Sequence, residues 1–307
     1  MLGRRSILAG ALAVGATGGL AGCGRAPRDD DGTTPRSPTT PPTPSHLRLL
    51  SYNVLADPVA VEQRIPALLR TIAAAQPDVL ALQEVAPWFL AWLEGAKWFA
   101  GFELARIAGD VARPNGQVIA SRLPIRTSRF VALPGDQART LLISELELDA
   151  RARVVVATTH MESFLEDGSI RAAQLDRIFA ELAPAGRDPS VAATVFAGDL
   201  NFGDGEQPET AHLDPGFVDA WTHLRPGEPG FTWDIEASEM ARRGSFVGEP
   251  SRRLDRILIR SREWSPRSIA IVGDRPVEPG RRELFPSDHF GLLAELGVEL
   301  ESPQPRE

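Results

Sequence analysis

Cysteine occurs only once in this chain of 307 residues, at Cys23, so no disulfide can form within one molecule. Histidine is also scarce, with 5 residues, and the groups of several His and Cys residues that hold zinc are absent from the sequence. There is no G-x-S-x-G nucleophile elbow and no phosphate-binding P-loop motif. A disulfide scaffold is therefore excluded. The sequence also lacks the motifs typical of zinc enzymes, of serine hydrolases with a nucleophile elbow and of P-loop nucleotide-binding proteins.

Positive charge is in the minority, because 33 Lys and Arg residues face 41 Asp and Glu residues and the formal net charge is −8. This balance argues against a broad basic face that wraps duplex DNA, but it is compatible with a local anion site built from a metal and a few Arg side chains. The chain is 43% hydrophobic and 24% charged, which is typical of a soluble globular protein with a sizeable core.

The N-terminal segment "MLGRRSILAGALAVGATGGLAGCG" has the composition of an export signal. Its apolar run is short and rich in Gly and Ala, too weak for a stable membrane span. Arg4 and Arg5 ahead of this run predict twin-arginine export. "LAGC" resembles the bacterial lipobox, which implies that Cys23 is lipidated and anchors the protein in the bacterial cell envelope. The alternatives are a plain secretory signal with a periplasmic product and a disordered tail with a chance cysteine.

Composition divides the chain into four parts. We expect an export signal over residues 1–22 and, over residues 23–45, the lipidated cysteine followed by a Pro/Thr-rich linker. The linker cannot bury a core and is expected to act as an extended spacer. The folded domain is predicted over residues 46–300, and residues 301–307 form a disordered tail.

Short apolar runs dominate the predicted domain. Helical spacing appears over residues 61–76, 87–99 and 169–182, whereas β-rich runs cover residues 47–55, 77–85, 116–125, 140–149, 152–160, 191–202, 252–260 and 288–300. Several neighbouring strands have no helix between them. This pattern favours an α+β fold in which two mainly antiparallel sheets pack face to face with helices outside.

Polar residues of catalytic type recur at or just beyond the ends of these apolar runs. Each alone fits a helix cap or a turn, but strand ends of a sandwich gather at one rim, so we expect them to lie together. The set comprises Asn53, Glu84, His160, Asp199, Asn201, Asp255, Asp288 and His289.

The residue types in this set suit metal-assisted hydrolysis of a phosphate ester. Glu84 is a hard oxygen ligand suited to Mg²⁺. Asp199 can orient or deprotonate a water, and Asn201 points the same way if the chain stays extended. His289 can donate to a phosphoryl oxygen as charge builds, provided that a carboxylate behind it keeps the imidazole cationic.

Six segments, "LLSYNVL", "LALQEV", "VVATTHMES", "FAGDLNF", "RLDRILI" and "PSDHFGLL", resemble in order and approximate spacing the motifs of the endonuclease/exonuclease/phosphatase superfamily. The resemblance covers nearly all of residues 47–300, and the C-terminal half is most similar to the tyrosyl-DNA phosphodiesterase 2 branch. It implies a four-layer αββα sandwich and phosphodiester cleavage by an activated water, with Mg²⁺ (Mn²⁺ as a substitute) and without a covalent enzyme intermediate.

The resemblance also assigns roles to individual residues. Glu84 is implied as the main metal ligand with Asn53 and Asp288 beside it, Asp199 as the base, and Asn201 as a phosphate contact. His289, held by Asp255, is implied to stabilise the transition state. His160 and Ser163 are implied to line the phosphate site, Arg139 to lie on the substrate side, and Trp233 in "GFTWD" to touch the leaving side or the first base. A core position is the alternative for Trp233.

Two departures from the tyrosyl-DNA branch argue against a tyrosyl-DNA adduct as the specific substrate. The first motif, "SYNVLAD", is nearer the deadenylase branch, and the acidic "GDGEQPE" follows "GDLNF" where the tyrosyl-DNA branch has a basic residue. The sequence therefore predicts an exported, membrane-anchored phosphodiesterase acting on single-stranded nucleic-acid ends, with no obligate protein partner indicated. The alternatives are a phospholipid or sphingomyelin phosphodiesterase or a phosphatase of the same fold, and a non-catalytic binding protein.

Overall fold

The computed structural model describes residues 45–105 and 116–298. The predicted export signal, Cys23, nearly all of the linker and the C-terminal tail lie outside these described residues. Within the described ranges, no helix has the length and apolar character needed to cross a membrane.

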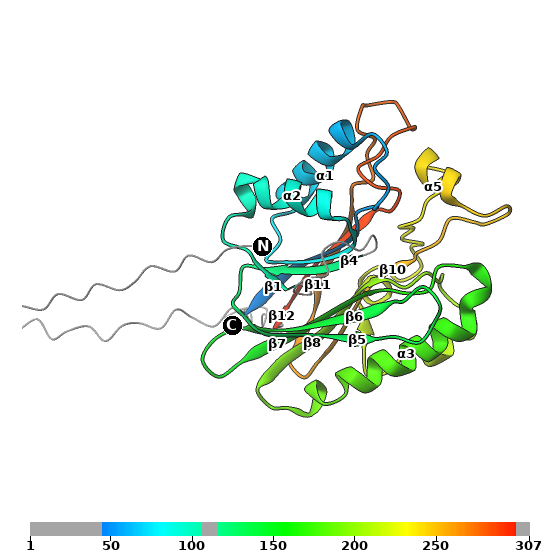
Figure 1. Cartoon of the computed structure of the whole chain (residues 1–307). Helices are drawn as coiled ribbons and strands as arrows, with labels where there is room; N and C mark the ends of the chain where they lie inside the picture. The colour runs from blue at the N-terminus through cyan, green and yellow to red at the C-terminus, as the bar shows by residue number, and fades with distance from the viewer. Residues whose placement is uncertain (1–44, 106–115, 299–307) are drawn as a thin grey trace, which may run out of the picture. The chain divides into compact units, whose positions relative to one another are not determined.

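Two six-stranded sheets form the centre of the domain (Figure 1). The order of the first sheet is β11-β12-β1-β2-β4-β3, and that of the second is β5-β6-β7-β8-β10-β9. The first sheet consists of β1 (His46–Asn53), β2 (Val79–Val85), β3 (Glu103–Ala105), β4 (Gly116–Ser121), β11 (Trp264–Val272) and β12 (Gly291–Val298). The second consists of β5 (Ile125–Ala132), β6 (Thr140–Glu147), β7 (Arg153–His160), β8 (Val191–Asp199), β9 (Val218–Asp219) and β10 (Asp255–Ser261). Each sheet has one parallel pair, β1–β2 or β7–β8, and is otherwise antiparallel, as predicted.

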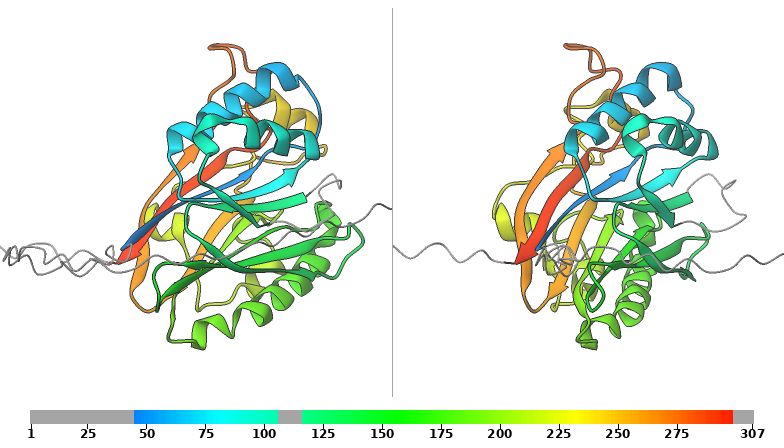
Figure 2. Two further views of the ribbon diagram at one scale, coloured as in Figure 1. Left: turned by 60° about the vertical axis from the view of Figure 1, so that its left-hand side comes forward. Right: turned by 90° about the vertical axis from the view of Figure 1, so that its left-hand side faces the viewer.

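Helices cover the outer faces of both sheets, which makes the four-layer αββα arrangement (Figure 2). Helices α1 (Val61–Ala75) and α2 (Pro87–Gly95) lie over the first sheet, and α3 (Gly168–Leu182) lies over the second. The shorter elements are η1 (Lys97–Phe99), η2 (Leu165–Asp167), η3 (Ala185–Arg187), η4 (Glu209–His212), α4 (Ala220–Leu224) and α5 (Glu239–Gly244). The predicted sandwich is therefore confirmed.

Two predicted elements are divided in the structure. The helix expected over residues 87–99 ends at Gly95, because Ala96 is extended (φ −77°, ψ 124°) and a separate 3₁₀ turn follows. The strand expected over residues 116–125 is split between β4 and β5. At the split, the Ser121 hydroxyl accepts a hydrogen bond from Leu123 N at 3.0 Å, which closes a turn ahead of Pro124.

The two-residue period of the strands explains how the polar strand ends meet. In β8, Val195 and Ala197 belong to the core between the sheets, so Asp199 has the same orientation one step further on. The same parity applies to Asn53 after Leu49, to His160 after Val156 and to Asp255 before Ile257. Strands β8 and β10 pair with Asp255 opposite Asp199, and β7 pairs with β8 with His160 opposite Asp199. The inter-sheet core therefore ends in a cluster of polar side chains.

Candidate active site

The buried carboxylate of Asp199 is the centre of the polar cluster. Its Oδ2 accepts a hydrogen bond from Asn53 Nδ2 at 3.0 Å and lies 3.4 Å from His160 Nε2 and 3.5 Å from His289 Nε2. Its Oδ1 accepts from Asn201 N at 3.1 Å. Burial opposes ionisation of Asp199, but His289, His160 and these hydrogen bonds outweigh it, so the pKa of Asp199 lies below its ordinary value. Asp199 is therefore an anionic proton acceptor.

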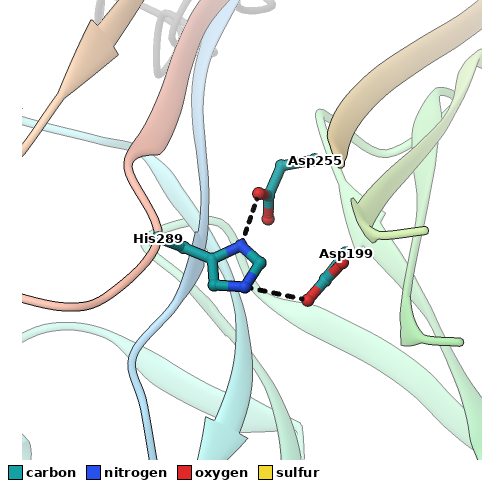
Figure 3. A group of neighbouring side chains, drawn as sticks. All are labelled: Asp199, Asp255 and His289. Atoms are coloured by element: carbon teal, nitrogen blue, oxygen red, sulfur yellow. Dashed lines mark hydrogen bonds and ion pairs between the residues drawn. The ribbon is translucent and has the colours of Figure 1, made fainter. Parts of the chain in front are cut away.

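His289 lies between two carboxylates, as Figure 3 shows. Its Nδ1 is 2.9 Å from Asp255 Oδ2, and its Nε2 faces Asp199. Burial acts to lower the pKa of His289, but the charges of Asp199 and Asp255 and the hydrogen bond to Asp255 raise it well above the usual value. The predicted pairing of His289 with Asp255 is present, and it produces an imidazolium at the cluster.

His160 is the electrostatic opposite of His289. It is buried beside Arg139 and His289, and burial is the main cause that lowers the pKa of His160 to about 4. Its Nδ1 lies 3.6 Å from Glu84 Oε1 and has no hydrogen-bond partner among the described residues. The two histidines thus differ in charge near neutral pH, and the neutral one keeps a nitrogen available.

Glu84 reaches the cluster through an irregular backbone. In β2, Leu80 and Leu82 face the helices, and a regular strand would direct Glu84 to that same outer face. Instead the β2–β4 register shifts between Leu82 and Val85, and Glu84 adopts a left-handed φ of 56°. Backbone of this kind in a non-glycine residue is costly and concentrates at functional sites. It brings Glu84 Oε1 to 3.1 Å from Asn53 Nδ2.

Asn201 also leaves the extended conformation, with φ 56°, so the extended chain that would point Asn201 the same way as Asp199 is not present. The hydrogen bond from Asn201 N to Asp199 Oδ1 closes a turn, and Asn201 Nδ2 donates to Met161 O at 3.0 Å. Asn201 still lines the same cavity as Asp199, and its side chain is held by Met161, the residue that follows β7.

These residues border a cavity of about 470 Å³ that is also lined by Arg139, Ser163, Trp233 and Asp288. Arg139 is 6% exposed, and burial lowers the pKa of its guanidinium. Its Nε and Nη2 donate to Gln137 Oε1, whereas its Nη1 has no hydrogen-bond partner among the described residues. A buried, unpaired guanidinium nitrogen beside a cavity is suited to binding an anion.

Trp233 is more enclosed than its loop position in the sequence indicates. It is 7% exposed and packs with Ala241 and Leu254, yet its ring lies 4.9 Å from that of His289 and it lines the cavity. Its Nε1 has no hydrogen-bond partner in the described part of the chain. The core and cavity descriptions of Trp233 therefore both apply, because the indole packs inward on one side and borders the cavity on the other.

Sequence reasoning missed three residues that hold the site together. The guanidinium of buried Arg64 in α1 donates to Val54 O at 2.8 Å and Pro286 O at 3.1 Å, joining the first motif to the last. Thr232 Oγ1 accepts from Asp255 N at 3.0 Å. Gln137, already described, orients Arg139. The only sequence signal for Gln137 is its position two residues before Arg139, and Arg64 has none, because its partners are backbone carbonyls.

Asp199, Asp255 and His289 are close enough together to hold a metal ion, but their chemistry does not suit one. Both ring nitrogens of His289 already face carboxylates, and its pKa is raised. A histidine that binds a metal must instead be neutral. Glu84 and Asp288 are hard oxygen donors that line the cavity and suit a divalent ion. Asn53 Nδ2 faces carboxylates and its Oδ1 accepts from Leu55 N at 3.1 Å, so in this structure Asn53 orients Glu84 and Asp199.

Comparison with known proteins agrees with this architecture. The sequence model of the Endonuclease/Exonuclease/phosphatase family matches residues 50–289. Tyrosyl-DNA phosphodiesterase 2 of Xenopus laevis is 30% identical over 263 residues, which cover 83% of this chain and 68% of the relative. The human tyrosyl-DNA phosphodiesterase 2 is 27% identical over 274 residues, with 87% of this chain and 72% of the relative covered.

Solved structures show the same fold. Tyrosyl-DNA phosphodiesterase 2 of D. rerio, complexed with single-strand DNA product, superposes with a TM-score of 0.70 and 25% identity over 83% of this chain and 100% of that one. The human Nocturnin catalytic domain has a TM-score of 0.63 at 19% identity, covering 83% of this chain and 95% of that one. The chain therefore belongs to the endonuclease/exonuclease/phosphatase family and is a hydrolase of the phosphodiesterase type.

Proposed function

We propose that this protein hydrolyses phosphodiester bonds at the ends of single-stranded nucleic acid with the help of Mg²⁺, and that a 5′-tyrosyl ester is its model substrate. The observation that carries the proposal is a set of unsatisfied nitrogens around one cavity. Arg139 Nη1, Trp233 Nε1 and His160 Nδ1 are buried without partners among the described residues, and all three residues line the cavity that contains Asp199. Buried polar atoms are normally paired, and a phosphate oxygen would supply the partner for the guanidinium donor of Arg139.

The chain's own groups suit the hydrolysis. Asp199, with its lowered pKa, accepts a proton from the attacking water and orients it. The His289 imidazolium donates toward the phosphoryl oxygens as negative charge grows on them, and Asp255 holds its ring in place. Arg139 binds a non-bridging oxygen. The bond between water oxygen and phosphorus forms while the bond to the leaving oxygen breaks, so no protein atom is joined to phosphorus.

Glu84 and Asp288 would hold the Mg²⁺, which typically takes one or two carboxylates and keeps several waters. When bound, the ion supplies positive charge that polarises the phosphoryl group. Asn53 supports this arrangement by fixing the Glu84 carboxylate at 3.1 Å, and Ala56 N fixes its other oxygen at 2.9 Å.

Nucleic acid is favoured as the substrate by an apolar wall of the same cavity, formed by Trp233, Phe246 and Leu254. Phe246 is 44% exposed and Trp233 borders the cavity beside His289, so both are placed to stack on an unpaired base. The D. rerio relative described with a single-strand DNA product has this fold, which supports the same substrate class here.

A phospholipid headgroup is the second candidate, because four exposed apolar side chains lie near the mouth of the cavity: Phe164, Leu165, Phe246 and Val247. Four substrates with Mg²⁺ separate the candidates: a 5′-tyrosyl oligonucleotide, plain single-stranded DNA, sphingomyelin vesicles and bis-p-nitrophenyl phosphate. We expect the highest kcat/KM on the tyrosyl oligonucleotide. Preferential cleavage of sphingomyelin would show that the substrate is a lipid and not a nucleic acid. If no phosphodiester is turned over, the proposed phosphodiesterase activity is refuted.

We further propose that the protein is exported and anchored to a membrane through lipid on Cys23, as "LAGC" after a short apolar run suggests. In the native host, Cys23→Ser should release the protein from the membrane fraction. Retention of the Cys23→Ser protein in that fraction would contradict the lipid anchor.

A further inference from the structure

A second cavity, of about 360 Å³, adjoins the catalytic one. The two cavities share the lining residues Glu249 and Arg252, which form an ion pair with each other, so the cavities are immediate neighbours. The second cavity, called the side cavity below, lies between Leu165 of η2 and Val247 of the loop after α5, and Glu206 and Glu209 complete the part that matters here.

The side cavity has an unsatisfied acceptor. Glu209 is 1% exposed; its Oε1 accepts from Arg171 Nε at 2.8 Å, but its Oε2 has no hydrogen-bond partner in the part of the chain that the structure describes. A buried carboxylate oxygen without a partner is unfavourable, and a hydrogen-bond donor bound in the cavity would remove that cost.

The charges of the side cavity favour a cation. Three carboxylates line it, Glu206, Glu209 and Glu249, against the two guanidinium groups of Arg171 and Arg252, which leaves one negative charge in excess. Both guanidinium groups already donate to protein oxygens. Arg171 also donates to Glu162 O and Phe164 O, and the two Nη atoms of Arg252 donate to Glu206 and Glu249, although its Nε has no partner.

This charge balance is unfavourable for a nucleic-acid strand, whose phosphates bind where Lys and Arg are available to neutralise them. If a substrate bound at Asp199 also enters the side cavity, the part that enters is expected to belong to the leaving group and not to the nucleic-acid strand. The rim adds an apolar component, since Leu165 is 45% exposed and the Val247 side chain is fully exposed. Lysine and arginine side chains combine such an apolar stem with a cationic head.

We propose that the side cavity binds a basic side chain of a peptide leaving group, so that the enzyme prefers tyrosyl adducts whose peptide carries Lys or Arg close to the tyrosine. This inference rests on the proposed function and specifies its leaving group. The apolar stem lies against Leu165 and Val247, and the cationic head donates to Glu209 Oε2 and to the more exposed Glu206.

The test compares 5′-tyrosyl oligonucleotides whose leaving peptides differ at one position, one or two residues from the tyrosine. Lysine is compared with norleucine, which has a similar stem and no charge, and with glutamate. We expect kcat/KM for lysine to exceed that for norleucine by about tenfold, the effect of one charged hydrogen bond, and glutamate to be the poorest. Glu206→Gln and Glu209→Gln should reduce this ratio, and Glu263→Gln, two residues after the end of β10 and outside the lining of both cavities, should preserve it.

The outcomes separate this inference from the proposed function. Cleavage of the plain tyrosyl oligonucleotide with equal rates for lysine and norleucine would overturn the side-cavity assignment and leave the phosphodiesterase in place. If no tyrosyl substrate is cleaved, the proposed function fails, and binding alone decides the cavity: calorimetry with the Asp199→Asn protein should show tighter binding of tyrosyl-lysine amide than of tyrosyl-norleucine amide. Cleavage of sphingomyelin vesicles that depends on Glu206 would assign the cavity to a lipid cation instead.

Discussion

Replacing Asp255 by Asn removes one negative charge from His289 while keeping an acceptor in the same place. Asp255 is fully buried, and its Oδ2 lies 2.9 Å from His289 Nδ1, so an Asn oxygen can still receive the Nδ1 proton. What is lost is the charge that helps Asp199 to raise the pKa of His289. Hydrogen bonds to charged groups contribute about 1.5–3 kcal/mol and neutral ones about 0.5–1.5 kcal/mol, so losing the charge alone should cost about 1–1.5 kcal/mol and lower kcat by about 5- to 10-fold, with a small change in KM.

The pH profile gives the sign of the effect. His289 acts in its protonated form, and its raised pKa keeps that form present as pH rises through neutrality. In Asp255→Asn this pKa falls, so the alkaline limb of kcat should move to lower pH. The assay is hydrolysis of bis-p-nitrophenyl phosphate with Mg²⁺ over a range of pH. Asp214→Asn, which breaks the pair between Asp214 and Arg260 away from the cavity, is the control.

An unchanged kcat and an unchanged alkaline limb in Asp255→Asn would refute the role of His289 as a charged donor. A change confined to KM would also contradict it, because His289 would then bind the substrate without stabilising the transition state. Circular dichroism of the variant should match the parent chain, which confines the effect to the site.

Three further predictions follow from single features. Glu84→Gln, or EDTA, should abolish turnover with the fold intact by circular dichroism; full turnover in EDTA would contradict a metal-assisted reaction. Trp233→Ala should lower kcat/KM on an oligonucleotide by about tenfold or more, the effect of losing one base stack, and leave bis-p-nitrophenyl phosphate nearly unchanged, whereas equal losses with a lower Tm would assign Trp233 to packing alone. Burial opposes ionisation of Asp204, but Arg253 and Arg256 lower its pKa, so its contribution to stability is present above the unfolded pKa and is lost as pH falls through the folded one. Asp204→Asn should therefore reduce Tm at pH 7, and this reduction should become smaller as the pH is lowered; a reduction that does not change with pH would contradict this.

Strand ends were predictable from the sequence because their physics is local. Alternation along β8 directs Asp199 between the sheets, and the same rule directs His160 and Asp255 there. Polar residues that follow buried runs therefore indicated both the sandwich and the composition of its rim. The helices α1 and α3 were equally predictable from the sequence, since their apolar spacing extends over whole segments.

Features set by distant contacts were not predictable. The turn of Glu84 into the site depends on a register shift between β2 and β4, which no local pattern indicates. The burial of Trp233 depends on Ala241 and Leu254, which pack against it from later in the chain. The side cavity is formed by η2, η4 and the loop after α5, three segments whose separation in sequence conceals that their carboxylates share one space.

The central claim is that Asp199 and the groups around it direct water at a phosphodiester. The most direct measurement is hydrolysis of a 5′-tyrosyl oligonucleotide by the full chain with Mg²⁺ in ¹⁸O-labelled water, in parallel with Asp199→Asn. We predict release of tyrosine and of a 5′-phosphate carrying one labelled oxygen, and loss of turnover by at least about a hundredfold in the variant. Unchanged turnover in Asp199→Asn, or a 5′-phosphate without label, would contradict the account.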